Sequence, residues 1–193
     1  MFEKVCNWFR EHGILLSNEE ANYLKENTKE IIIPKNTIIM SQGKSVDRLF
    51  FLNEGIVRLY RLHNDIDSTI DFVSWNEFVS SVFYIVNRQP SPCALETLTE
   101  IKALYWDREE ILTIMKEVKC AGKIENTLLE ILLNWTQDRE IDRMCLTPEE
   151  RYLKLIKSHP SVVQQIPQKY IASFLGIHQD SLSRIRKKIS RQN

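Results

Sequence analysis

The chain has 193 residues, of which 43% are hydrophobic and 27% charged, with 26 basic and 26 acidic side chains. This composition is that of an ordinary globular protein and excludes a disordered or fibrous chain, while the length allows one large domain or two small ones. The sequence has neither a stretch of about eighteen apolar residues nor a leader with a basic start and an apolar centre, so we expect a cytoplasmic protein with no membrane partner.

The net charge of zero hides an uneven distribution along the chain. Residues 166–193 contain six Lys or Arg and one Asp, a net charge of +5, which leaves −5 on residues 1–165. A basic end on an acidic body predicts one module that meets an anion and another that does not. The four cysteines are far apart and form no C-x-x-C motif, so we expect reduced thiols.

The first half of the chain changes from helical to strand periodicity. Residues 1–29 are predicted to form one or two short helices, with Ser17 and Glu20 spaced as a capping box. Residues 30–106 hold short β-rich runs separated by turns such as Asn53-Glu54-Gly55. This pattern predicts an antiparallel sandwich or barrel, and the periodicity alone leaves a sandwich, an OB-fold and a jelly roll open. The predicted fold class is α+β.

A long helix is predicted over residues 116–144, after a shorter helix capped by Asp107 and Glu110. Its apolar residues include a seam at heptad spacing, formed by Ile124, Leu128, Ile131 and Trp135. Further leucines widen the apolar surface beyond one face. We therefore predict that one side packs on the strand domain and the other pairs with a second copy in a homodimer. A core helix in a monomer is the alternative.

The C-terminal region is predicted to be helical. Thr147, Pro148 and Glu150 mark the start of a helix that ends at His159-Pro160. The stretch "IPQKYIASFLGIHQDSLSRIRKK" (166–188) then indicates two short helices joined by a glycine, which is the pattern of a helix-turn-helix. The alternative is a helical hairpin whose basic tail is a solvated terminus, because cations also favour helix C-termini.

The second of these helices shows polar residues at its start and basic residues at its end. Arginine can bind guanine with two hydrogen bonds, glutamine can pair with adenine, and aspartate can accept from cytosine. Further basic side chains would contact phosphates and position the protein. We therefore predict double-stranded DNA as a partner. The predicted contact residues are Lys169, His178, Gln179, Asp180, Ser183, Arg184, Lys187 and Lys188.

The whole chain resembles the Crp/Fnr family of bacterial transcription regulators. The resemblance is carried by "RLFFLNEGIVRLY", by the long helix, and above all by "IASFLGIHQDSLSRIRKK", while "QPSPCALETLTE" resembles a Bacteroidetes-type branch. It implies a cyclic-nucleotide-binding-like jelly roll in residues 1–115, a dimerisation helix in 116–144 and a helix-turn-helix domain in 145–193. It also implies base contacts from Gln179, Asp180 and Arg184, and RNA polymerase as a further partner.

The sequence departs from this family where cyclic-nucleotide members hold the phosphate with a Gly-Glu pair and an Arg-Ser pair. Here Ser80-Ser81 and Pro90-Ser91 stand at those positions. A buried phosphate needs a cation or converging donors, so we expect no tight cAMP binding and leave open another small-molecule effector or none. The residues predicted to line an effector pocket are Ser80, Ser81, Val82, Arg88, Ser91, Cys93 and Asn134.

The second departure is the wing, a β-hairpin that follows the reading helix in the family. The sequence stops at Asn193, so we expect no full wing and fewer phosphate contacts. No nucleophile–base pair or cluster of metal ligands is recognisable, so we predict neither an enzyme nor a metal site. Two other functions remain open. One is an effector-binding or protein-interaction module with a decayed DNA reader, and the other is an enzyme built on the strand domain.

Overall fold

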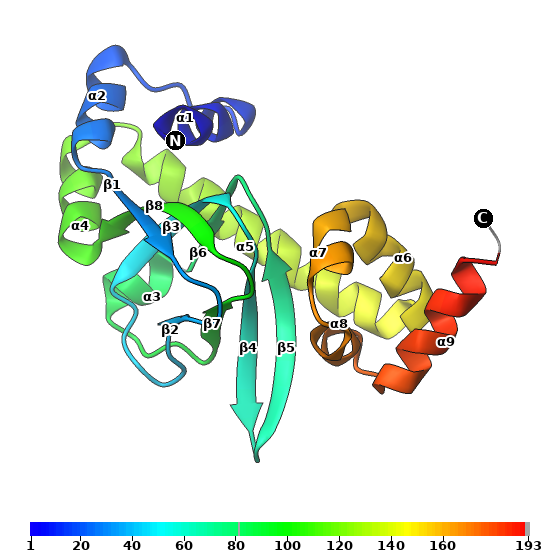
Figure 1. Cartoon of the computed structure of the whole chain (residues 1–193). Coiled ribbons are helices and arrows are strands. Elements are labelled where there is room, and N and C mark those ends of the chain that lie inside the picture. The colour runs from blue at the N-terminus through cyan, green and yellow to red at the C-terminus, as the bar shows by residue number, and fades with distance from the viewer. Residues whose placement is uncertain (81, 192–193) are drawn as a thin grey trace.

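The computed structural model describes residues 1–80 and 82–191, and within them the strands form two packed sheets (Figure 1). The strands are β1 (Lys29–Ile33), β2 (Ile38–Met40), β3 (Arg48–Glu54), β4 (Val57–His63), β5 (Ile66–Val73), β6 (Glu77–Val79), β7 (Ala94–Thr97) and β8 (Ile101–Asp107). One sheet has the order β1-β8-β3-β6 and the other β2-β7-β4-β5, and the paired strands are antiparallel. This is the jelly-roll arrangement, so the predicted antiparallel jelly roll is confirmed.

The two sheets differ in how deeply they are buried. The five central residues of β3 are all buried, because the second sheet covers one face and helices cover the other. In contrast, β4 is buried only in its first half and ends in three exposed residues. The outer parts of β4 and β5 extend below the body as a hairpin, and α8 lies beside β5 (Figure 1).

Four helices complete the strand domain. They are α1 (Phe2–Glu11), α2 (Asn18–Glu26), α3 (Val82–Asn87) and α4 (Arg108–Glu117). The predicted capping box of α2 is present, since the Glu20 backbone N–H donates to Ser17 Oγ and the Ser17 N–H donates to the Glu20 carboxylate. These helices pack against the outer face of the β3-containing sheet through an aromatic-rich core.

Helix α5 (Ala121–Cys145) runs from the strand domain to the C-terminal helices (Figure 1). It begins five residues later than the predicted start at residue 116. The chain leaves the α4 helix at Val118, whose backbone is extended and whose side chain is buried in the core. The buried valine thus separates α4 from α5, in agreement with the two helices predicted here, although the long one starts later than residue 116. Within residues 1–80 and 82–191, every helix is too short or too polar to span a bilayer.

The C-terminal part contains α6 (Pro148–Ser158), α7 (Pro160–Gln165), α8 (Gln168–Leu175) and α9 (Gln179–Ile189). Helix α6 starts and ends where predicted, but α7 was not predicted. Pro160 ends one helix and opens the next, because the first position of a helix needs no backbone N–H. The described residues end at Arg191, two residues after α9, and the lack of a wing stays a prediction.

Two glycines make turns that position these parts. Gly55 joins β3 to β4 with a φ of +98°, and a Cβ there would lie 2.5 Å from the Glu100 carbonyl oxygen. Gly176 ends α8 in the left-handed conformation, with a φ of 68°. That conformation costs glycine little and fixes the angle at which α9 leaves α8.

Candidate functional site

Helices α8 and α9 form a compact pair around a small apolar core. The core includes Ile171, Ala172 and Leu175 from α8 and Leu182 from α9, all of them buried. Tyr152 and Leu155 of α6 close the other side. The burial of Leu182 fixes which side of α9 faces inward, so the opposite side must face solvent.

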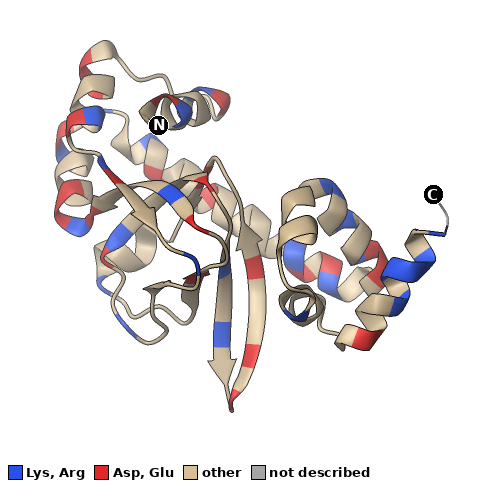
Figure 2. Cartoon of the chain, in the orientation of Figure 1, with Lys and Arg blue, Asp and Glu red and all other residues tan. Residues whose placement is uncertain are grey.

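The solvent side of α9 carries most of the residues that the sequence predicts to contact DNA. His178, Gln179, Asp180, Arg184 and Lys187 are exposed. In an α-helix, positions 179, 180, 183, 184 and 187 lie on one face, opposite position 182. Figure 2 shows an acidic residue at the start of α9 and basic residues along the rest of it. The helix therefore presents hydrogen-bonding side chains at its start and cations toward its end.

Two predicted phosphate contacts have partners within the chain. Lys188 Nζ lies 2.7 Å from Glu149 Oε2 of α6, and Lys169 Nζ lies 4.6 Å from the ring centre of Tyr170. The Lys188 side chain is more than half exposed, and an exposed ion pair is worth at most about 1 kcal/mol. A phosphate can therefore replace Glu149 as the partner of Lys188.

Helix α8 is docked on strand β5 of the sandwich. The Thr69 backbone N–H donates to Ser173 Oγ at 2.9 Å, and Ser173 Oγ in turn donates to the Asp67 carbonyl at 3.1 Å. The rings of Phe72 and Phe174 pack with their centres 5.4 Å apart. These contacts fix the helix pair against the β4–β5 hairpin.

A buried arginine completes this docking surface. Arg58 of β4 is only 3% exposed and lies between two tyrosine rings, with its guanidinium carbon 4.1 Å from the ring centres of both Tyr60 and Tyr170. It donates two hydrogen bonds to Asp67, at 2.6 and 2.7 Å, and one to Glu96, at 2.8 Å. Burial alone would lower the pKa of Arg58, but these hydrogen bonds raise it above its usual value. Tyr170 belongs to α8, so the cluster joins the two parts of the chain.

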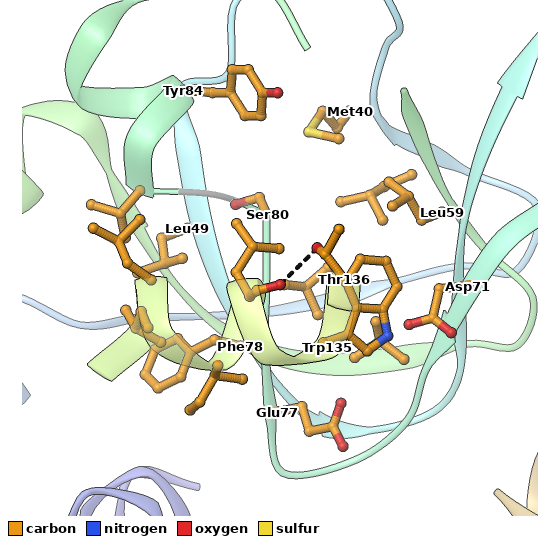
Figure 3. Close-up of a pocket in the computed structure, with 18 of the residues that line it drawn as sticks. Met40, Leu49, Leu59, Asp71, Glu77, Phe78, Ser80, Tyr84, Trp135 and Thr136 are labelled. Atoms are coloured by element: carbon orange, nitrogen blue, oxygen red, sulfur yellow. Dashed lines mark hydrogen bonds between the residues drawn. The ribbon is translucent and has the colours of Figure 1, made fainter. Parts of the chain in front are cut away.

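A cavity of about 810 Å³ lies in the strand domain beneath α5 (Figure 3). Its walls are mostly apolar and aromatic, with Leu49, Leu59 and Phe78 from the strands and Leu132 and Trp135 from α5. This size and lining are those of a small-molecule site. Because α5 also continues toward the C-terminal helices, the cavity lies against an element that connects both parts.

The residues predicted to line an effector pocket are only partly brought together. Ser80, Val82, Ser91 and Cys93 lie on the cavity wall, and Ser81 falls outside the described residues. Arg88 and Asn134 are exposed and do not line the cavity. Arg88 follows α3 in a positive-φ turn on the outer surface, and Asn134 lies on the outward side of α5.

The serine hydroxyls in the cavity wall are already engaged by the backbone. Ser80 Oγ donates to the Arg48 carbonyl at 2.6 Å, and Ser91 Oγ donates to the Cys93 carbonyl at 2.8 Å. No lysine or arginine occurs among the described residues that line the cavity. The cationic partner that a phosphate requires is thus missing from the described wall.

Three acidic residues line the cavity instead, Glu11, Asp71 and Glu77, and none of them was predicted from the sequence. Burial raises the pKa of Asp71 to about 7, and the nearby Glu77 adds to the rise, while the Phe72 backbone N–H, Arg139 and Trp135 oppose it. Burial of its carboxyl also raises the pKa of Glu77, although the residue is exposed on its outer side. Figure 3 shows the Asp71 carboxyl beside the indole nitrogen of Trp135.

The heptad-spaced seam of α5 lies mostly against the strand domain. Ile124 and Leu128 pack against the chain's own core, while Ile131 and Trp135 line the cavity. Ile131 is still 38% exposed, so pairing of this seam with a second copy stays a prediction. The most exposed apolar residue in the middle of the helix is Leu133, which does not line the cavity.

Comparison with known proteins identifies the strand domain. Residues 30–118 match the family described as the cyclic nucleotide-binding domain. No curated protein sequence matches the chain. These 89 residues include the eight strands from Glu30 onward, with α3 and α4.

Solved structures extend the likeness to the C-terminal helices. FixK2 from Bradyrhizobium japonicum is 14% identical, with a TM-score of 0.73 over 86% of this chain and 85% of its own. The c-di-GMP-responsive global regulator CLP from Xanthomonas campestris is 15% identical, with a TM-score of 0.70 over 91% of this chain and 93% of its own.

A third similar structure, from Eubacterium rectale, is described as a transcriptional regulator of the Crp/Fnr family. It is 17% identical, with a TM-score of 0.72 over 92% of this chain and 85% of its own. At these identities the likeness concerns the fold. Residues 30–118 therefore match the cyclic nucleotide-binding domain family, and the chain has the fold of the solved Crp/Fnr regulators.

Proposed function

We propose that this chain is a homodimeric, DNA-binding transcription regulator of the Crp/Fnr type that responds to a small molecule in its strand domain. Residues 1–115 would hold the effector, residues 116–144 would pair with a second copy, and residues 145–193 would bind double-stranded DNA. RNA polymerase would be a further partner at the promoter. The observation that carries this proposal is the exposed polar and basic face of α9 in a chain with this fold.

The arrangement of α9 suits a helix that enters the major groove. Gln179, Asp180 and Arg184 lie near its start, where a recognition helix meets base edges. Lys187 and Arg191 follow toward its end, where they can reach the phosphates on either side of the groove. Leu182 holds this face outward by anchoring the opposite side in the helical core.

Dimerisation is supported by the open side of α5. Leu133, Ile141 and Met144 lie outside the cavity lining and are 57%, 58% and 77% exposed, on a helix of 25 residues. Pairing α5 with its copy would remove these side chains from water, each worth roughly 1 kcal/mol or more. It would also place two copies of α9 in one complex, as recognition of a two-part DNA site requires.

A conformational change caused by effector binding would be transmitted to the reading helix through β5. Asp71 and Val73 of this strand face the cavity, while Phe72 packs on Phe174 of α8. Successive residues of a strand point to opposite faces, so a shift of β5 that accommodates a ligand also moves the surface on which α8 is docked. Trp135 and Arg139 of α5 contact the same strand region, since Arg139 donates to the Ile70 carbonyl at 3.0 Å.

DNA binding is tested by replacing one side chain of the reading face. Arg184→Ala should weaken binding to the promoter of its own operon by roughly 5- to 150-fold, since a two-pronged arginine–guanine contact is worth about 1–3 kcal/mol. Binding to unrelated DNA should fall much less. A gel-shift titration with both DNAs measures the two changes.

The matched control is Arg10→Ala, which removes the same charge from an exposed position on α1. It should leave promoter binding unchanged. If Arg184→Ala also leaves it unchanged, or if the protein binds every DNA equally weakly, sequence-specific reading is refuted. The chain would then be an effector-binding or protein-interaction module with a decayed DNA reader.

A further inference from the structure

The cavity differs from a nucleotide site in the sign of the charges around it. The charged residues among its described lining are the acidic side chains Glu11, Asp71 and Glu77. Two histidines also line it, and burial lowers the pKa of His159, so that ring is neutral at pH 7. A ligand entering this space meets carboxyl groups without a lysine or arginine in the described wall.

Asp71 places a carboxyl group in this apolar setting. It projects from the middle of β5 toward the indole of Trp135, between strand side chains and α5 (Figure 3). Arg139 is the nearest cation, but its guanidinium donates to the Ile70 carbonyl and lies 5.1 Å from the ring centre of Trp135, outside the cavity lining. The Asp71 carboxylate is thus not neutralised within the cavity.

Aromatic rings supply the rest of the recognition surface. Trp8, Trp75, Phe78, Tyr84 and Trp135 all line the cavity. The faces of such rings attract organic cations, and tryptophan does so most strongly. A carboxyl group among aromatic rings is the combination that binds an ammonium group attached to an apolar body.

We propose that the cavity binds an organic cation, an amine or alkylammonium with an apolar or aromatic body, whose positive group pairs with Asp71. This inference rests on the proposed function of the cavity as an effector site and names the class of ligand. The apolar body would pack along Leu132 and Trp135 of α5, so the ligand would contact β5 and α5 together. An anionic ligand such as a cyclic nucleotide would face unpaired carboxyl groups and bind poorly.

The pH dependence of binding follows from the ionisation of Asp71. Its pKa is about 7, so at pH 6 most of the Asp71 carboxyl is protonated and must lose its proton to pair with a cation. An alkylammonium stays charged up to about pH 10. Affinity should therefore rise from pH 6 to pH 8. Burial raises the pKa of the nearby Glu77 as well, so its titration changes the affinity for a cation in the same direction.

The test uses three probes that share one indole ring and differ in charge. Tryptamine is cationic, tryptophol is neutral and indole-3-acetate is anionic. Thermal unfolding of the full chain is followed with each probe at millimolar concentration, with cAMP as a fourth. Tryptamine should raise the Tm most, and by more at pH 8 than at pH 6. Indole-3-acetate and cAMP should have no effect.

Asp71→Asn keeps the shape of the side chain and removes its charge. In this variant calorimetric affinity for tryptamine should fall by at least about tenfold and lose its pH dependence, while tryptophol should bind as before. The matched control is Asp65→Asn in the exposed β4–β5 turn, where Asn tolerates the observed φ of 60° and binding should not change.

Equal shifts with tryptamine and tryptophol, a larger shift with cAMP or indole-3-acetate, or no shift with tryptamine would overturn the proposed ligand class. Promoter binding by the wild-type chain separates this outcome from a failure of the proposed function. If Arg184→Ala still weakens promoter binding, the regulator stands and only the ligand class is wrong. If Arg184→Ala leaves promoter binding unchanged, the gel-shift titration has refuted the proposed function itself.

Discussion

At the scale of single residues, the most consequential side chain outside the cavity and α9 is Arg58. It holds two carboxylates and two tyrosine rings together at the junction of the β4–β5 hairpin and α8. Arg58→Ala would leave Glu96, which is largely buried, without its cation. Removing one partner of a buried pair is costly, so we expect the free energy of unfolding to fall by about 3 kcal/mol in urea denaturation.

Arg48→Ala is the comparison for this prediction. Arg48 pairs with Asp107 at 2.8 Å, but its side chain is 48% exposed and Asp107 keeps Lys29 as a second partner. An exposed pair of this kind should contribute less than about 1 kcal/mol. If both variants lose the same free energy of unfolding, the burial of Arg58 adds nothing to the stability that its ion pairs provide.

At the scale of elements, α5 has two apolar sides with different surroundings. One side closes the cavity and the core, and the other is open around Leu133. Leu133→Glu should convert a dimer to a monomer, because a buried charge in the paired helices would lack a partner. Light scattering after size-exclusion chromatography measures the mass directly.

Ile66→Glu provides the control for the dimer, because it makes the same kind of change at the exposed tip of the β4–β5 hairpin. It should leave the mass of the assembly unchanged. A wild-type chain that elutes as a monomer at all concentrations would contradict pairing through α5.

At the scale of the whole molecule, the charge is divided between a body of −5 and a C-terminal region of +5. Binding to DNA should therefore weaken steeply with salt, by a slope of about −0.9 per phosphate contact on a double-logarithmic plot. Lys187→Ala should make this slope shallower by roughly one unit per bound copy and weaken binding to all sequences alike. Fluorescence anisotropy across a salt series would show it, and a slope unchanged by Lys187→Ala would exclude this phosphate contact.

Much of this fold could be predicted from the sequence, because its signals are local. The capping pairs Ser17–Glu20 and Thr147–Glu150 and the turn at Gly176 each depend on residues a few positions apart. The docking of α8 on β5 could not be predicted in the same way. It depends on contacts between distant segments, such as the packing of Phe72 on Phe174.

The candidate site shows the same division. The polar face of α9 follows from helical periodicity, and so its residues could be named from the sequence. Asp71 could not, because a single aspartate in an ordinary strand gives no sign that it faces a cavity. The apolar seam of α5 could be named from the sequence, but periodicity indicates that a face is buried and not what buries it, so its pairing with a second copy stays a prediction.

Asp71 and Phe72 occupy neighbouring positions of β5, one facing the cavity and the other facing α8. DNA bound to the C-terminal helices should therefore change the affinity of the cavity for its ligand. If a ligand at Asp71 changes the affinity of the reading helix for its promoter by some factor, the promoter must change the affinity for that ligand by the same factor. Saturating promoter DNA should thus tighten or loosen the binding of a ligand far from any base. The coupling could be measured from the cavity alone, by a ligand titration with and without DNA.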